Sequence, residues 1–126
     1  MKSFWNKTIA FAFLLALAVG FGCNRTTPPP TPLTAEELPG ALELAFNKAK
    51  PQAKELATLV VTSVKGRDFP KAFTTIQALA ALPDLTKEQV NVAARATITV
   101  SGLLQEAQAQ GDAKAAAAVK HYRETK

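Results

Sequence analysis

The side chains with the greatest potential for chemistry are one thiol and one imidazole, Cys23 and His121. A thiolate beside an imidazole can act as a nucleophile with its base, and both groups bind zinc. A structural zinc site takes four ligands, however, and a chain with one cysteine and one histidine cannot supply four ligands of these two types. We expect His121, near the end of the chain, to face solvent at a helix terminus. The sequence therefore predicts no metal site and no Cys–His nucleophile.

Carboxylates offer acid–base chemistry where two of them converge. Three acidic residues, Glu36, Glu37 and Glu43, are close in sequence. Acidic residues at the start of a helix are better explained by the helix dipole, because they stabilise its positive end. The six glycines are scattered and form no glycine-rich phosphate loop. We predict that the protein is not an enzyme and uses no cofactor.

The 126-residue chain carries 15 basic and 10 acidic residues, a formal net charge of +5. Its basic residues gather at residues 48–54 and 120–126, and acidic residues interrupt both groups. A nucleic-acid footprint is a concentrated basic stripe with aromatic residues for stacking. We therefore predict solvated helix faces and no nucleic-acid partner.

Cys23 directly follows an apolar run. Lys2 and Lys7 precede this run, and residues 9–21 are thirteen Ala, Leu, Ile, Phe, Val and Gly residues. A positive beginning and an apolar run of this length are typical of a secretory signal. A membrane span needs about 20 apolar residues, and the uncharged stretch at residues 8–24 has seventeen. An uncleaved single-span anchor therefore stays open as an alternative.

This arrangement, with Gly22 before Cys23, resembles the signal of bacterial lipoproteins. Gly20 and Phe21 depart from the aliphatic and small residues usual at their positions. The resemblance implies that the signal is cut before Cys23, whose acyl chains, palmitate among them, hold the protein on the membrane. Asn24 in place of an aspartate implies transfer to the outer membrane, with the domain facing the periplasm. A secretory cut after Gly20 would instead release a soluble protein with a free thiol.

The residues after the cysteine are rich in proline. Four prolines lie within residues 24–33. Such a segment favours the polyproline II conformation, and ten residues of it span about 30 Å. The sequence thus predicts three parts: a signal peptide at residues 1–22, a lipidated cysteine with its linker at 23–33, and a helical domain at 34–126. Removal of residues 1–22 leaves thirteen basic and ten acidic residues, a net charge of +3.

The domain has the start and stop signals of five helices. The starts are capping residues or a first-turn proline, at Thr34, Pro51, Asp68, Thr86 and Asp112. Gly66 and Gly111 end helices, and Pro83 stops another. We expect Pro39 to kink or restart the first helix, because a proline inside a helix removes a hydrogen bond. The last helix is expected to run from Ala113 to about Arg123.

These signals predict an all-α fold, a small antiparallel bundle of four or five helices. The β-branched residues at 60–64 and 97–100 could form strands, but they lie inside longer helical periods, so we expect helix. The longest helix is expected to bury one face, made of Val90, Ala93, Ala94, Thr97, Ser101, Leu104 and Ala107. Much of the expected core is alanine, which buries little area. The domain should therefore be modestly stable or gain buried area from a partner.

Two turns are alike in sequence, at Gly66 and at Gly111, each with an aspartate shortly after the glycine. They resemble the Gly-acidic-x-x-Ala turn of tetratricopeptide repeats. The two glycines are 45 residues apart, whereas that repeat has about 34. Convergent helical-hairpin chemistry stays open as the other explanation.

Two functions fit these observations. The first is a lipid-anchored envelope protein whose helical domain is a protein-interaction module for another envelope protein. The alternative is a structural envelope protein that self-associates through its alanine-rich helix faces.

Overall fold

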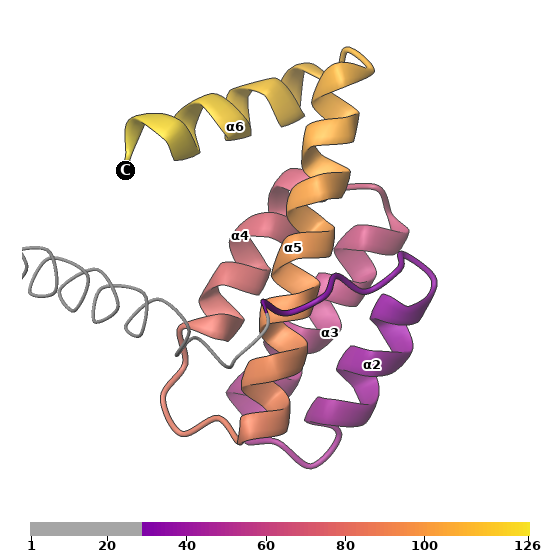
Figure 1. Ribbon diagram of the computed structural model, residues 1–126, viewed down its shortest axis with the longest axis vertical. Coiled ribbons are helices and arrows are strands. Elements are labelled where there is room, and N and C mark those ends of the chain that lie inside the picture. Colours follow the sequence, from indigo (N-terminus) through magenta and orange to yellow (C-terminus); the bar gives the residue numbers. More distant parts are fainter. Residues whose placement is uncertain (1–28) are drawn as a thin grey trace, which may run out of the picture.

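The computed structural model describes residues 29–126 (Figure 1). This part of the chain is all-helical and contains no strand, as the sequence predicts. Its helices are α2 (Glu37–Phe46), α3 (Pro51–Lys65), α4 (Phe69–Ala80), α5 (Lys87–Ala109) and α6 (Ala113–Glu124). The β-branched segments at residues 60–64 and 97–100 lie inside α3 and α5, so the expectation of helix there is confirmed.

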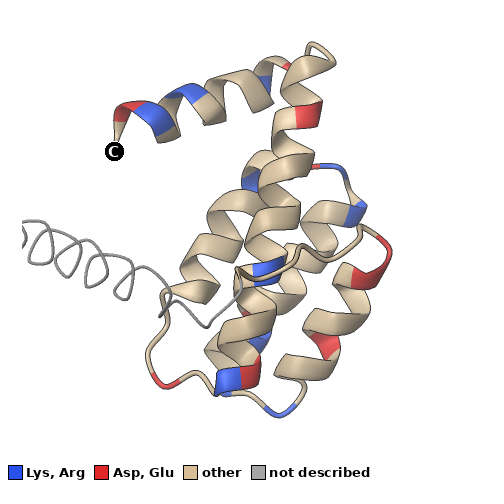
Figure 2. Ribbon diagram, in the orientation of Figure 1, with Lys and Arg blue, Asp and Glu red and all other residues tan. Residues whose placement is uncertain are grey.

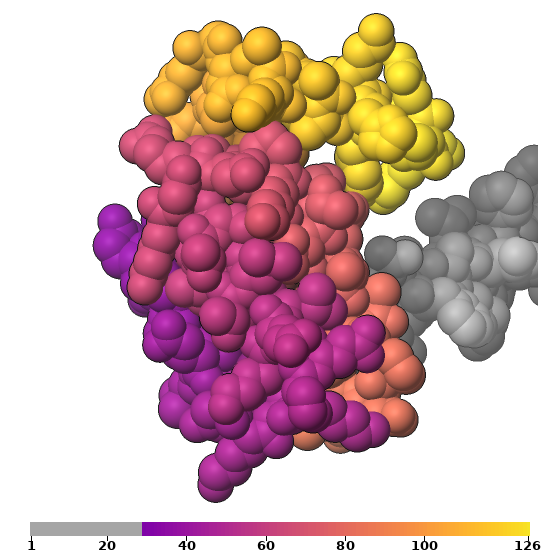
Figure 3. Space-filling view, turned by 180° about the vertical axis from the view of Figure 1, so that it is seen from behind, coloured from indigo at the N-terminus to yellow at the C-terminus, as the bar shows by residue number. Residues whose placement is uncertain are grey.

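Helices α2 to α5 form an antiparallel bundle in which the chain runs alternately up and down (Figure 1). Within it, α2 and α4 each pack against both α3 and α5. Helices α3 and α5 are not neighbours and lie diagonally opposite each other. Consequently, the outer side of α3 and the outer side of α5 face in opposite directions. Figure 1 views the molecule from the side of α5, and Figure 3 views it from behind, where α3 is exposed.

The fifth helix, α6, is not a fifth member of the antiparallel bundle. It turns away at the end of α5 and runs across the top of the molecule in Figure 1, packing only on α5 and α4. The yellow atoms of α6 overhang the bundle in Figure 3. The end of α5 that carries α6 extends beyond its neighbours because α5 has 23 residues and α4 has 12.

The core is light, as predicted. Its largest fully buried side chains come from all four bundle helices: Phe46, Leu38, Leu42, Ile76, Leu79, Val60 and Val100. Seven of the buried residues are alanines: Ala53, Ala57, Ala72, Ala93, Ala96, Ala107 and Ala115. Alanines allow the helices to approach closely, but each contributes little buried area.

Most of the capping residues predicted from the sequence cap helices in the structure. Thr86 and Gln89 form a complete capping box, and Asp68 and Asp112 accept hydrogen bonds from the first turns that follow them. The first helix is expected to kink or restart at Pro39, and this is confirmed in part: Thr34 and Glu37 cap one turn, closed by the bond from the N–H of Leu38 to the carbonyl of Thr34, and the helix restarts at Glu37, with no break at Pro39 itself. Because α2 begins at Glu37, Pro39 lies in its first turn, where the backbone N–H groups have no helical partner to lose.

The buried face of α5 differs in part from the predicted face. Val90 is 53% exposed, and Ala94, Thr97 and Ser101 are only half-buried. The structure buries Val92, Ala96, Thr99 and Val100 instead, together with the expected Ala93, Leu104 and Ala107. The apolar side chains of α5 itself are spread over most of its circumference. Their spacing in the sequence therefore does not indicate which side of the helix is buried. The choice is made by the two helices that pack against α5 within the bundle, α2 and α4, and by the segment that precedes α2.

That segment, residues 29–36, crosses the outer side of α5 (Figure 1), and we call it the strap. The side chain of Leu33 is only 6% exposed and belongs to the core. The hydroxyl of Thr99 donates a hydrogen bond of 2.6 Å to the carbonyl of Leu33, and Nε of Arg95 donates one of 2.9 Å to the carbonyl of Thr31. The packed unit therefore begins before Thr34, with residues that the sequence places in the linker.

Candidate functional site

The sequence-predicted lipidation site, Cys23, lies outside the described residues. His121 is exposed near the end of α6, as expected. Glu37 is used in capping, since its carboxylate accepts a hydrogen bond of 3.1 Å from the backbone N–H of Thr34. Within residues 29–126, no group of three His, Cys, Asp or Glu side chains could hold a metal ion. None of the helices described has the length and apolarity that a membrane span requires.

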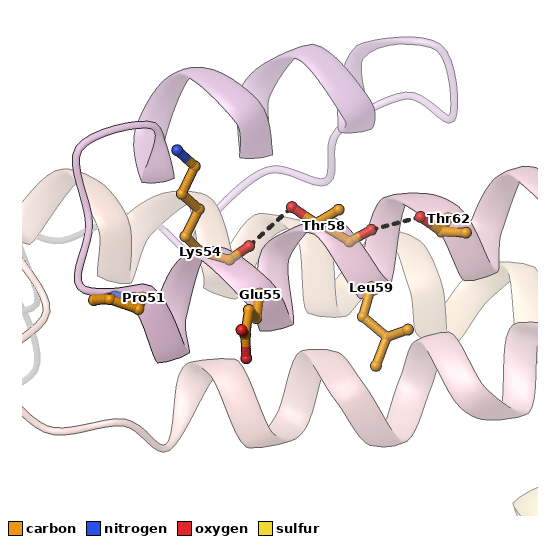
Figure 4. Close-up of a pocket in the computed structure, with 6 residues that line it drawn as sticks. All are labelled: Pro51, Lys54, Glu55, Thr58, Leu59 and Thr62. Carbon is orange, nitrogen blue, oxygen red and sulfur yellow. Dashed lines mark hydrogen bonds between the residues drawn. The ribbon is translucent and has the colours of Figure 1, made fainter.

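One depression runs along the outer side of α3, with a volume of about 470 Å³. It is lined by Pro51, Lys54, Glu55, Thr58, Leu59 and Thr62. Figure 4 shows Lys54 reaching toward α2, while Glu55 and Leu59 point toward α4. The hydroxyls of Thr58 and Thr62 donate hydrogen bonds of 2.9 Å to carbonyls one turn back. These threonines therefore offer a ligand their methyl groups and an accepting oxygen.

A second depression, of about 160 Å³, lies between α2 and α3. It contains Leu42, Phe46 and Glu43 of α2, and it shares Lys54 and Thr58 with the first. The two depressions therefore adjoin each other, and together we call them the α3 groove. Most of its lining is apolar; Lys54 lines both depressions, whereas Glu55 lines only the first and Glu43 only the second.

A third cavity, of about 140 Å³, lies under α6, and we call it the α6 notch. Three helices line it, with Phe73, Ser101, Leu104, Gln105, Val119, Tyr122 and Arg123. The rings of Phe73 and Tyr122 meet edge to face, with 5.2 Å between their centroids. Nζ of Lys126 lies 4.6 Å from the centroid of the Tyr122 ring, within the range of a cation–π contact.

The α3 groove and the α6 notch are alike in the residue types that line them. Neither the α3 groove nor the α6 notch contains a histidine or a cysteine. The α3 groove combines apolar walls with three charged groups and the α6 notch with one, the composition of an interaction surface. In residues 29–126 the ion pairs are Lys50–Asp84 and Lys120–Glu124, so the lysine of the groove is in neither.

Sequence reasoning missed both the strap and the α6 notch. One signal for the strap was present, because Arg95 is the only charged residue between Glu88 and Glu106. A single charged side chain in a long uncharged stretch of helix indicates a specific hydrogen-bond acceptor elsewhere in the chain. The notch had a weaker signal in Tyr122, the only tyrosine, which follows Ala115 and Val119 on one side of the last helix.

Comparison of the chain with protein-family models, with curated proteins and with solved structures finds no match in any of the three.

Proposed function

We propose that the protein is a lipid-anchored bacterial envelope protein whose helical domain is an interaction module for another envelope protein. In this proposal Cys23 is acylated and residues 1–22 are removed. The domain faces the periplasm, from the outer membrane. An uncleaved single-span anchor and a secreted form are the alternatives for its location. We propose no enzymatic activity, no cofactor and no nucleic-acid partner.

The observation that carries the proposal is the position of the strap relative to the α3 groove. The strap enters the domain across α5, where Arg95 and Thr99 hold it. The α3 groove is on the helix diagonally opposite, so it faces away from the side on which the chain arrives. An anchor attached through the strap would leave this groove open to the surrounding compartment. Its largely apolar lining and Lys54 suit a helix or loop that carries an apolar residue beside a carboxylate.

The first test is the mass of the mature protein from a bacterial host. Acylation of Cys23, with residues 1–22 removed, is expected. A protein that retains its first methionine and is recovered without membranes would contradict the anchor and the location together.

The second test is site-specific photocrosslinking in the intact envelope. A photoreactive residue in place of Lys54 is expected to capture one defined protein. The matched control is the same residue in place of Lys114, another exposed lysine, which lies on α6 outside the α3 groove. Equal capture from both positions, or none from Lys54, would contradict the role of the groove.

The alternative function, a structural protein that self-associates, is favoured by a different observation. No charged residue occurs between Lys71 and Asp84, the stretch that includes nearly all of α4. The exposed residues of this helix include Thr74, Ala78 and Ala80, which are small enough for close helix packing. Sedimentation of the mature protein in detergent separates the two functions. A mass that stays that of one chain over a wide concentration range would exclude self-association.

A further inference from the structure

The outer side of α5 is an exposed apolar stripe. We define this α5 stripe by Val90, Ala94, Ile98 and Gly102, which are four residues apart and therefore lie on one side of the helix. Val90 is 53% exposed and Ile98 is 41% exposed. In Figure 2, α5 is tan over most of its length, with charged residues near its two ends. Between Glu88 and Glu106 the sequence has one charged residue, Arg95. The stripe is therefore apolar in a protein whose net charge is positive.

The strap brings the chain to this stripe. Thr31 is held by Arg95, which is three residues from Ile98 on the same helix. Only seven residues, 24–30, separate Cys23 from Thr31. In an extended polyproline conformation these residues span about 22 Å. A lipid on Cys23 would thus keep the α5 side of the domain, and not the α3 side, next to the bilayer.

Cations stand around the stripe. Lys87 is exposed one turn before Val90, at one end. At the other end, Ser101 and Gln105 continue from the stripe into the α6 notch, whose wall includes Arg123. Lys126 lies beside the same notch, over the ring of Tyr122. The side that carries the α5 stripe is therefore apolar at its centre and basic at its rim.

No carboxylate belongs to the α5 stripe itself, although Glu88 and Glu106 of α5 and Glu36 of the strap are exposed beside it. At about 100° per residue, Glu88 and Glu106 point about 80° away from Ile98 around α5. Glu124 of α6 is paired with Lys120, with 3.9 Å between nitrogen and oxygen. On α4 the first acidic residue after Lys71 is Asp84, which lies beyond the helix and is paired with Lys50. The rim cations are thus not neutralised by carboxylates on the stripe itself.

We propose that the α5 stripe and the cations at its rim, Lys87, Arg123 and Lys126, contact the anionic headgroups of the membrane that holds the anchor. The inference rests on the proposed lipid anchor. Phosphate groups pair with the cations, while Val90 and Ile98 enter the interfacial region of the bilayer. The domain is thereby oriented with its α3 groove pointing away from the membrane. One side binds lipid, and the other is presented to a protein.

The test uses the mature acylated protein in vesicles made of purified lipid. A fluorophore is attached at residue 98 in Ile98→Cys, or at residue 58 in the matched control Thr58→Cys, which is exposed in the α3 groove. Cys23 carries the lipid and does not react with the label. One set of vesicles is phosphatidylcholine, and in the other about a third of it is replaced by phosphatidylglycerol. Lipids that carry a spin label on the headgroup quench a fluorophore that touches the surface.

Headgroup quenching is expected at residue 98 and not at residue 58, and it should be stronger with phosphatidylglycerol. Adding Lys87→Gln and Arg123→Gln to the Ile98→Cys protein removes two cations. The ratio of docked to undocked domains should then fall about thirtyfold. Salt should lower the same ratio, because it screens the attraction between exposed charges.

Each other outcome has a distinct meaning. If the protein floats with the vesicles but residues 98 and 58 are quenched equally, the anchor stands and the inference is wrong. If the protein does not float with either kind of vesicle, the anchor and the inference both fall. Self-quenching at residue 98 that grows with protein density, without quenching by lipid, would assign the stripe to a second copy of the chain and overturn the inference.

Discussion

Replacement of Leu33 by alanine tests whether the strap belongs to the folded domain. Leu33 precedes the predicted first residue of the domain, yet its side chain is only 6% exposed. The change removes three buried carbon groups, each worth about 0.8 kcal/mol. The free energy of unfolding should therefore fall by about 2 to 3 kcal/mol, with a further contribution from any cavity left behind. For a domain of this size, the melting temperature should drop by about 10 to 20 °C.

The measurement is urea denaturation followed by circular dichroism, with Thr31→Ala as the matched control. Thr31 uses only its backbone carbonyl in the strap, so its exposed side chain should contribute less than about 0.5 kcal/mol. Thr99→Val should cost about 1 to 3 kcal/mol, because it leaves the buried carbonyl of Leu33 without its partner. The double variant Leu33→Ala, Thr99→Val should cost less than the sum, since both changes release the same segment. A cost below about 0.5 kcal/mol for Leu33→Ala would refute the assignment of the strap to the core.

Four further changes have defined outcomes. Tyr122→Ala removes the edge-to-face contact with α4 and should cost about 1 to 3 kcal/mol; amide exchange should rise in α6 more than in α2, whereas the exposed control His121→Ala should change neither. Thr86→Ala breaks the capping box at the start of α5 and should lower stability by about 1 kcal/mol in urea denaturation. Gly111 has φ +90° and open space around it, so Gly111→Ala should cost about 1 kcal/mol of backbone strain in the same assay. Arg67 has φ +57°, and Arg67→Gly should leave stability unchanged or raise it by up to about 1 kcal/mol; equal effects of the two turn variants would contradict this reasoning.

The α3–α4 and α5–α6 turns show how much of their likeness could be recognised from their sequences. In the first, the N–H of Asp68 bonds to the carbonyl of Ser63, and in the second, the N–H of Asp112 bonds to the carbonyl of Ala107. Both are the same helix C-terminal motif, with the left-handed residue just before the aspartate. The structural equivalent of Gly111 is therefore Arg67 and not Gly66. The likeness was visible in sequence, but its register was shifted by one residue.

Helix positions were predictable because their signals are local. A capping side chain or a first-turn proline acts within four residues, as Pro51 and Asp68 illustrate. The buried face of α5 was not predictable in this way. Valines, isoleucine and alanines occur on every side of it, so that Val90 and Val92 were equally good candidates for the core. The packing of α2, α4 and the strap against α5 decides which one is buried, and the strap residues are more than 60 positions away in sequence from their partners in α5.

The position of α6 was unpredictable for a related reason. Short connections favour antiparallel neighbours, and the α5–α6 connection has the same hydrogen-bonded turn as the α3–α4 connection. The turns alone would therefore make both helix pairs alike. The difference lies in length, because α5 continues beyond the end of α4 and no bundle helix is available there for α6 to follow. Tyr122 then finds its partner in Phe73 near the beginning of α4.

The strap also changes how far an anchored domain could reach. If residues up to 33 formed the spacer, ten residues would give about 30 Å of freedom, enough for the domain to turn either side toward the membrane. With Thr31 and Leu33 held on α5, about 22 Å remain. Two packed helix layers are about 20 Å thick with their side chains. A spacer about as long as the domain is thick is too short to pass around it, so attachment at α5 favours one orientation, and the α3 groove then lies about 20 Å beyond the membrane-facing side.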